Sequence, residues 1–219
     1  MATYDVVMFD LDGTLTDPKI GITKSVQYAL SRFNILENNL DNLEPFIGPL
    51  PAESFQKYYS FKESRARQAA MFYREYFSKF GIYENVVYPG IPDLLMQLYR
   101  TRKKLIVATL KPTLFAEKIL KRLELSDYFT LIVGSNLDGT RSSKAEIIQY
   151  VLSELPGILK QNIIMVGDHE QDIIGANNNG IDSIAVAYGY GSIEELQNAN
   201  PTYFANSVED LRVLINGGK

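Results

Sequence analysis

The fold of this chain is decided by residues 6–15, VVMFDLDGTL. The apolar run at 6–9 is typical of a buried strand, and it ends in two carboxylates, Asp10 and Asp12. Residues two apart in an extended chain point to the same side, so both carboxylates should face one site beyond a sheet edge. Two acids this close repel each other unless a cation lies between them or one holds a proton. The alternative is a plain Asp-Gly turn in which the acids accept hydrogen bonds from nearby backbone.

The composition is that of an ordinary globular protein. Of the 219 residues, 46% are hydrophobic and 22% are charged, which suits one large domain or one domain with an insert. A net charge of −4 does not favour a nucleic acid polymer as partner. No apolar run approaches the roughly 20 residues that span a bilayer, and no signal peptide is visible. The absence of cysteine excludes disulfides and a Cys nucleophile, and we expect a cytoplasmic protein.

The hydrophobic periodicity from residue 16 to 84 is helical. Apolar residues recur at helical spacing over 22–33, and a long helix is predicted over 62–80, with Gly81 as its C-cap. Residues 34–51 are polar and interrupted by Gly and Pro, so loops and short turns are expected there. We therefore expect residues 16–84 to form a helical cap domain inserted into the chain.

After residue 84, strands alternate with helices. The predicted strands of the whole chain are 4–9, 105–109, 131–133, 163–166 and 183–186. This alternation argues for a parallel sheet with helices on both faces. The predicted fold class is α/β, with a Rossmann-like parallel core formed by residues 1–15 and 85–219 and an inserted all-helical cap.

Chemically active side chains follow the predicted strands at their carboxyl ends. These residues are Asp10, Asp12, Thr109, Lys144, Asp168 and Asp172. Ligands of an open parallel sheet bind beyond the carboxyl ends of its strands, so we expect one shared site. The residue types suit phosphoryl transfer, because a carboxylate can attack phosphorus and carboxylate oxygens are ligands that Mg²⁺ prefers. Lys144 and Thr109 can neutralise and hydrogen-bond phosphate oxygens.

In this arrangement the chain resembles the haloacid dehalogenase-like hydrolases. The four motifs of that superfamily correspond, in order, to residues 10–14, Thr109, Lys144 and residues 167–172. The segment 16–84 resembles the helical cap that follows the first motif. Residues 46–49, 136–141 and 189–191 resemble the phosphoglycolate-phosphatase-like branch.

The resemblance implies a role for each residue that matches a motif. Asp10 would be the nucleophile, and Asp12 would protonate the leaving oxygen and then activate water. Thr109 and Lys144 would hold the phosphate. An acid at position 12 favours a phosphatase or phosphomutase over a dehalogenase or an ion pump.

The resemblance also implies a Mg²⁺ site. Asp10 and Asp168 would ligate the metal with their carboxylates, and Asp12 would do so through its backbone carbonyl. Asp172 would support Asp168 or act as an occasional ligand.

Three other features each have a functional and a structural interpretation. Lys111 competes with Lys144 as the phosphate-binding lysine, but Lys144 fits the motif order and Lys111 is expected to face the cap. His169 could act as an acid or base, although Asp12 already fills that role and a variable loop position is favoured. Residues 136–140, NLDGT, echo the first motif, but the amide of Asn136 is a poor nucleophile, so a structural turn is expected.

Arginines on the predicted cap helix form a further candidate set. Arg65, Arg67 and Arg74 could meet a substrate anion, although charged residues on a helix usually form its solvated face. The sequence does not decide between these interpretations.

The function implied is a Mg²⁺-dependent phosphatase that hydrolyses a small phosphomonoester through an aspartyl-phosphate, similar to phosphoglycolate phosphatase. The alternatives are a 5'-nucleotidase acting on nucleoside monophosphates and a sugar phosphomutase of the β-phosphoglucomutase type. The expected partner is a small phosphorylated metabolite, with no membrane association and a monomer or homodimer as the assembly.

Overall fold

The computed structural model describes residues 4–217, which divide into two compact units. The first unit joins the chain up to Asp17 with the chain from Val87 onward, and the second unit is Pro18–Val86. The first unit is called the core here and the second the helical insert. The core is therefore assembled from two pieces of chain that are separated by the insert.

The core is built on a six-stranded sheet with the order β5-β4-β1-β6-β7-β8. The strands are β1 (Val6–Phe9), β4 (Lys104–Pro112), β5 (Leu131–Ser135), β6 (Ile163–Gly167), β7 (Asp182–Val186) and β8 (Tyr203–Ala205). All neighbouring strands run parallel. Every residue of β1 is buried, as expected for a strand that is covered on both faces. The predicted parallel α/β core is confirmed.

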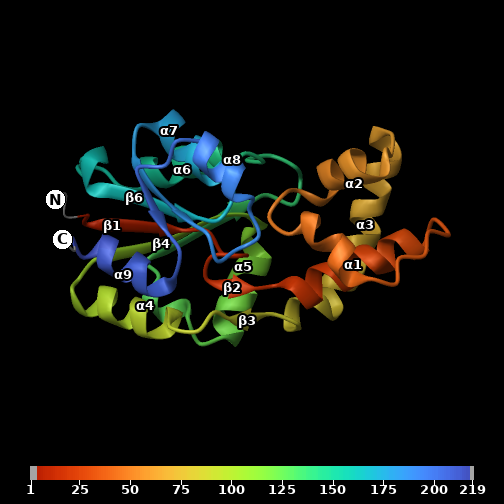
Figure 1. The fold of residues 1–219 in the computed structure, drawn as a ribbon, viewed down its shortest axis with the longest axis horizontal. Helices are drawn as coiled ribbons and strands as arrows, with labels where there is room; N and C mark the ends of the chain where they lie inside the picture. Colours follow the sequence, from red (N-terminus) through yellow and green to blue (C-terminus); the bar gives the residue numbers. More distant parts are fainter. Residues whose placement is uncertain (1–3, 218–219) are drawn as a thin grey trace. The chain divides into compact units, whose positions relative to one another are not determined.

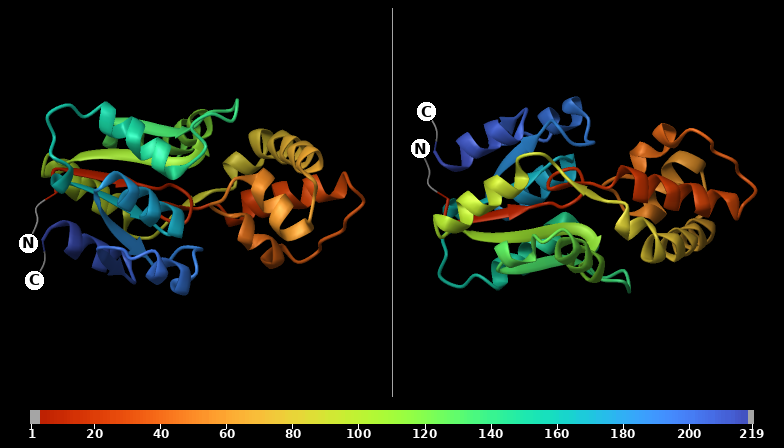
Figure 2. Two further views of the ribbon diagram at one scale, coloured as in Figure 1. Left: turned by 90° about the horizontal axis from the view of Figure 1, so that it is seen from above. Right: turned by 90° about the horizontal axis from the view of Figure 1, so that it is seen from below.

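Helices cover both faces of this sheet (Figures 1 and 2). Those of the core are α4 (Ile91–Arg100), α5 (Thr113–Arg122), α6 (Lys144–Ser153), α7 (Glu170–Asn179), α8 (Ile193–Asn198) and α9 (Val208–Ile215), with the 3₁₀ turns η3 (Ser126–Tyr128) and η4 (Lys160–Asn162). α4 and α9 lie together on one face, and α6 packs beside α7 on the other. The sheet's carboxyl edge is left open for loops.

The helical insert has its own apolar interior. It contains α1 (Lys19–Ser31), η1 (Leu40–Phe46), α2 (Pro51–Tyr59), α3 (Glu63–Lys79) and η2 (Gly81–Tyr83). Both α1 and α2 pack against α3. Phe55 is fully buried, stacks on Phe61 at an interplanar angle of 11° and meets Phe46 edge-on. Within residues 4–217, no helix is both long and apolar enough to cross a membrane.

Two short segments lead into and out of the insert. β2 (Thr16–Asp17) and β3 (Val86–Val87) pair as a separate two-stranded sheet. Paired strands lie about 4.8 Å apart, so the chain leaves and re-enters the core at neighbouring points.

The structure differs from the sequence prediction at α2, at β8 and at the end of α3, and the short strands β2 and β3 were not predicted either. α2 was not predicted, because its polar sequence PAESFQKYY buries only Ser54 and Phe55 and so shows no apolar stripe. β8 was also missed, since it is a three-residue edge strand. Gly81 is not the C-cap of α3, because Phe80 occupies that position and Gly81 begins the following 3₁₀ turn.

Candidate active site

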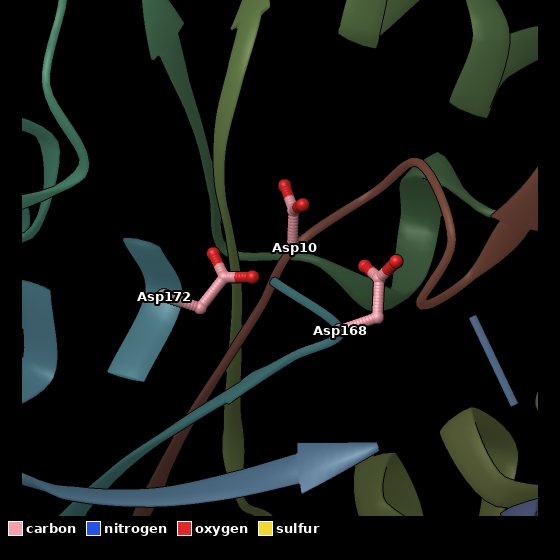
Figure 3. Close-up of side chains that lie close together, drawn as sticks. All are labelled: Asp10, Asp168 and Asp172. Carbon is pink, nitrogen blue, oxygen red and sulfur yellow. The ribbon is translucent and has the colours of Figure 1, made fainter. Parts of the chain in front are cut away.

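Three buried carboxylates meet at the carboxyl edge of the sheet. Asp10 follows β1, Asp168 follows β6, and Asp172 lies in the first turn of α7. One oxygen from each lies within 4.8 Å of the others, and Figure 3 shows the three side chains directed towards a common space. Asp10 is 5% exposed and the other two are fully buried. So much negative charge out of water requires positive charge nearby.

A tight turn after β1 allows Asp168 to approach. Gly13 has a φ of +81°, and a Cβ atom there would lie 2.0 Å from Oδ2 of Asp168, so only glycine fits. The hydroxyl of Thr14 donates to Oδ1 of Asp168 at 2.9 Å, and the backbone N–H of Tyr190 donates to Oδ2 at 2.9 Å. Each oxygen of this carboxylate is thus held by a different donor. Burial nevertheless raises the Asp168 pKa, and the neighbouring Asp10 adds to this effect.

Asp172 is fixed by the start of its own helix. Its Oδ2 accepts a hydrogen bond of 3.1 Å from the backbone N–H of His169. Burial raises the pKa of Asp172 to about 7, and the ammonium of Lys144 opposes this rise. In the metal-free site, the carboxyl group of Asp172 is therefore protonated much more readily than that of an exposed aspartate.

Lys144 supplies positive charge to two of these carboxylates. Its Nζ lies 3.0 Å from Oδ1 of Asp10 and 2.6 Å from Oδ1 of Asp172, and it donates to the carbonyl of Ala108 at 3.0 Å. Lys144 is the first residue of α6, and the side chain of Ser143 caps that helix. Burial alone would lower the Lys144 pKa, but the two carboxylates raise it overall.

A second buried ion pair lies beside the first. Nζ of Lys111 is 2.6 Å from Oδ2 of Asp12, and both side chains are at least nine-tenths buried. Burial raises the Asp12 pKa, while Lys111 counteracts part of the rise. We expected Lys111 to face the insert; the structure shows that its ammonium pairs with Asp12 in the core. This pairing was not expected from the sequence, because the predicted strand stopped at Thr109, whereas β4 continues to Pro112 through an irregularity between Ala108 and Pro112.

The structure therefore brings together all six residues selected from the sequence. Their relative exposures are 6% or less in every case. Thr109 accepts a hydrogen bond of 3.2 Å from the backbone N–H of Lys111, the residue whose ammonium pairs with Asp12. The assembly of the site is observed, whereas the role of each residue remains a prediction.

The secondary candidates occupy less central positions. Nε2 of His169 lies 3.7 Å from Oδ2 of Asp168, at the margin of the carboxylate cluster. Asn136 belongs to a loop closed by the bond from its Nδ2 to Oγ1 of Thr140, at 2.8 Å. Arg65 stacks on two aromatic rings of the insert, and Arg67 pairs with Glu63 one turn earlier.

The carboxylate cluster fits a divalent cation. Oδ1 of Asp10 and Oδ1 of Asp172 are buried and accept no hydrogen bond from the described residues, although both lie close to the Lys144 ammonium. Their repulsion and their hard oxygen donors suit Mg²⁺ or a similar ion. A parallel α/β core with this acid–lysine cluster at its carboxyl edge defines a class of metal-using hydrolases.

Comparison with known proteins places the chain within that class. The haloacid dehalogenase-like hydrolase family model matches residues 7–186, and the chain belongs to this family. It is 44% identical over 212 residues to a 5'-nucleotidase of Pseudomonas aeruginosa, covering 97% of this chain and 96% of that protein. It is 23% identical over 217 residues to a phosphoglycolate phosphatase of Colwellia psychrerythraea, covering 95% and 96% of the two chains.

A solved structure agrees with this assignment. The crystal structure of a predicted phosphatase from Clostridium acetobutylicum matches with a TM-score of 0.94 and 48% identity, covering 98% of this chain and 99% of that one. The chain is accordingly a haloacid dehalogenase-like phosphatase, that is, a phosphoric monoester hydrolase.

Proposed function

We propose that this protein is a Mg²⁺-dependent phosphatase that hydrolyses nucleoside 5'-monophosphates. The observation that carries the proposed chemistry is the gathering of Asp10, Asp12 and Asp168 with two lysines in one buried cluster. Hydrolysis of phosphate monoesters is among the slowest uncatalysed reactions, so a site must stabilise charge strongly to catalyse it. Four acids and two ammonium groups, all buried, provide such a site.

In the first half-reaction, Asp10 is the nucleophile. One of its carboxylate oxygens forms a bond to phosphorus, and the ester P–O bond breaks. The electron pair of that bond goes to the leaving oxygen, which takes a proton from the carboxyl group of Asp12. The products are an aspartyl-phosphate on Asp10, an ionised Asp12 and a free alcohol.

In the second half-reaction, Asp12 acts as the base and Asp10 is the leaving group. Asp12 removes a proton from a water molecule as the water oxygen attacks phosphorus. The aspartyl P–O bond breaks, its electron pair returns to Asp10, and inorganic phosphate leaves. Throughout, Lys144 and the hydroxyl of Thr109 hold phosphate oxygens, which restricts their motion and balances their charge.

The proposed metal ligands are the carboxylates of Asp10, Asp168 and Asp172, together with the backbone carbonyl of Asp12. Bound there, Mg²⁺ would offset the charge of the carboxylates and of the phosphate dianion. Thr14 and the backbone of Tyr190 already orient Asp168 for this task, as partners of metal ligands commonly do.

The comparisons support a nucleotide substrate over phosphoglycolate. Identity to the P. aeruginosa 5'-nucleotidase is 44%, against 23% to the phosphoglycolate phosphatase, at similar coverage. This reverses the order in which the sequence motifs ranked the two substrates.

A substrate panel tests the proposal. Phosphate release is measured with and without Mg²⁺ for nucleoside 5'-monophosphates, phosphoglycolate and hexose phosphates, and hexose phosphate isomerisation is followed in parallel. We expect the highest kcat/KM for a nucleoside monophosphate and no isomerisation. A preference for phosphoglycolate would refute the substrate assignment, and isomerisation without phosphate release would indicate a mutase.

The nucleophile is tested separately. Asp10→Asn should reduce turnover of every substrate to background, because an amide oxygen cannot form the phospho-enzyme. Asp127→Asn should leave activity unchanged, because it alters an exposed carboxylate just before β5, at the amino ends of the strands. Full activity in Asp10→Asn would refute the mechanism.

A further inference from the structure

We infer that Lys111 is a positioning residue for Asp12 and directs its second carboxyl oxygen towards the leaving oxygen of the substrate. The inference rests on the proposed function, since it presumes that Asp12 donates a proton to that oxygen. It adds a residue that the four family motifs do not include. Two features of the structure support this role: the two Asp12 oxygens differ in their partners, and the backbone of Lys111 is held by its neighbours.

The two oxygens of Asp12 have different surroundings. Oδ2 lies 2.6 Å from Nζ of Lys111, within a pair whose side chains are only 5% and 8% exposed. Oδ1 is buried and receives no hydrogen bond from any residue in 4–217. An unsatisfied buried carboxyl oxygen is costly, so its retention requires a reason. A substrate oxygen that shares a proton with Oδ1 would provide one.

Lys111 can hold Asp12 because its own backbone is tightly constrained. Its N–H donates to the hydroxyl of Thr109 at 3.2 Å. On the neighbouring strand, Oγ of Ser135 donates to the carbonyl of Leu110 at 2.7 Å. Gly134 approaches so closely that a Cβ atom there would lie 2.0 Å from the carbonyl oxygen of Lys111. The lysine therefore extends from the end of β4, which is held by the neighbouring strand, and not from a loop.

Lys144 does not duplicate this function. Its ammonium contacts Asp10 and Asp172, and Lys111 contacts Asp12, so the two lysines serve different carboxylates. Lys144 would act on phosphate and nucleophile, whatever the leaving group is. Lys111 would act only through Asp12, and of the two proton transfers of Asp12, the one to the leaving oxygen is the one that kcat/KM for release of the alcohol reports.

The test compares leaving groups. A nucleoside leaves as an alcohol and requires a proton, whereas p-nitrophenolate is stable enough to leave without one. For Lys111→Met, we expect kcat/KM for nucleoside release from a nucleoside monophosphate to fall by about 10²-fold, a typical general-acid contribution. For p-nitrophenol release, kcat/KM should change by less than about threefold, because that step gains little from a general acid. Lys118→Met, which removes an exposed lysine on α5, is the matched control and should change neither value.

Further variants distinguish a failure of this inference from a failure of the proposed function. Asp12→Asn should show the same selective loss, and the double variant Lys111→Met with Asp12→Asn should lose little more, because both changes remove one function. Equal losses on both substrates, or no loss, in folded Lys111→Met would overturn the inference while leaving the proposed function intact. Retention of nucleoside release by Asp12→Asn would instead overturn the proposed function. If Lys111→Met does not fold, Lys111→Gln provides the same comparison, with folding checked by circular dichroism.

Discussion

At the scale of single residues, the aspartates of the site share one chemistry but differ in their neighbours. Asp10 and Asp172 face Lys144, and Asp12 faces Lys111. Asp168 instead accepts from a hydroxyl and a backbone N–H, which carry no full charge. This division suits a nucleophile, an acid–base group and metal ligands placed side by side, because environment decides which role each carboxyl can take.

The raised pKa of Asp172 predicts an effect of pH on metal binding. Burial moves its pKa from 3.8 to about 7, with Asp10 and Asp168 adding to the rise and Lys144 opposing it. A folded pKa above the unfolded value means that the Asp172 contribution to stability is fully present below pH 4 and is lost as pH rises through about 7. Because Mg²⁺ binds the ionised form, its stabilising effect should grow over the same interval.

Thermal unfolding measures this effect directly. The rise in Tm on adding Mg²⁺ should be larger at about pH 8 than at about pH 5.5. Asp172→Asn should reduce the difference between the two pH values. An equal rise at both would contradict the prediction.

The hydrogen bond from Thr14 predicts a change in metal affinity. Thr14→Val keeps the shape of the buried side chain but removes the donor to Asp168 at 2.9 Å. Loss of such a partner usually weakens metal binding by about 10–100-fold. Mg²⁺ titration of activity should show this weakening, with a smaller change in kcat at saturating metal. Thr101→Val, an exposed position at the end of α4, serves as the control and should behave like the unchanged protein.

Much of the site was predictable because the ends of short apolar strands can be recognised in the sequence. Asp10 and Asp168 follow short apolar runs, and the parallel topology brings those ends together without further information. The Lys111–Asp12 pair was not predictable in the same way, because it depends on β4 continuing three residues beyond Thr109. A polar extension of an apolar strand is stabilised by its neighbours in the sheet, and these are not visible in the local sequence.

At the scale of elements, the same contrast applies to the fold. The strands of the core with a clear apolar pattern were predicted within a few residues, for example β6, which was predicted over 163–166 and spans Ile163–Gly167. α2 was missed because tertiary packing, chiefly of Phe55, supports a segment with weak periodicity. Elements with a strong period of their own are therefore predictable, while those supported by distant neighbours are not.

A close approach within the helical insert gives an element-scale prediction. Gly21 lies in α1, and a Cβ atom there would be 2.1 Å from the carbonyl oxygen of Gly81. Alanine normally stabilises a helix interior relative to glycine by about 1 kcal/mol. Here, Gly21→Ala should instead destabilise the protein by about 1–3 kcal/mol, because α1 and η2 would have to separate. Denaturant unfolding measures the change, and Ser31→Ala at the exposed end of α1 should be close to neutral. A more stable Gly21→Ala variant would contradict the argument.

At the scale of the whole molecule, the two units predict separable contributions to activity. The core alone contains Asp10, Asp12, Thr109, Lys144, Asp168 and Asp172. Because β2 pairs with β3, the points at which the insert joins the core are adjacent. A chain in which a short Gly-Ser linker replaces residues 18–86 should therefore fold and retain slow, Mg²⁺-dependent hydrolysis of p-nitrophenyl phosphate.

The same deletion should reduce discrimination among substrates. We expect kcat/KM values for nucleoside monophosphates and phosphoglycolate to converge, because loops outside a conserved scaffold commonly set specificity. Circular dichroism would confirm folding, and the substrate panel would measure the convergence. A folded deletion variant that keeps the full nucleotide preference would place specificity in the core instead.

The central position of β1 also affects the order in which a ribosome-bound chain can fold. Val6 emerges early, yet its partners in the sheet are Lys104 and Ile163. At roughly 5–20 residues per second, several seconds pass before either neighbour is synthesised. The insert, in which α1 and α2 pack on α3 within residues 18–86, can fold during this delay, while β1 remains unpaired and its backbone groups can bind other chains. Chaperone dependence during synthesis should therefore arise from the first strand rather than from the much longer insert.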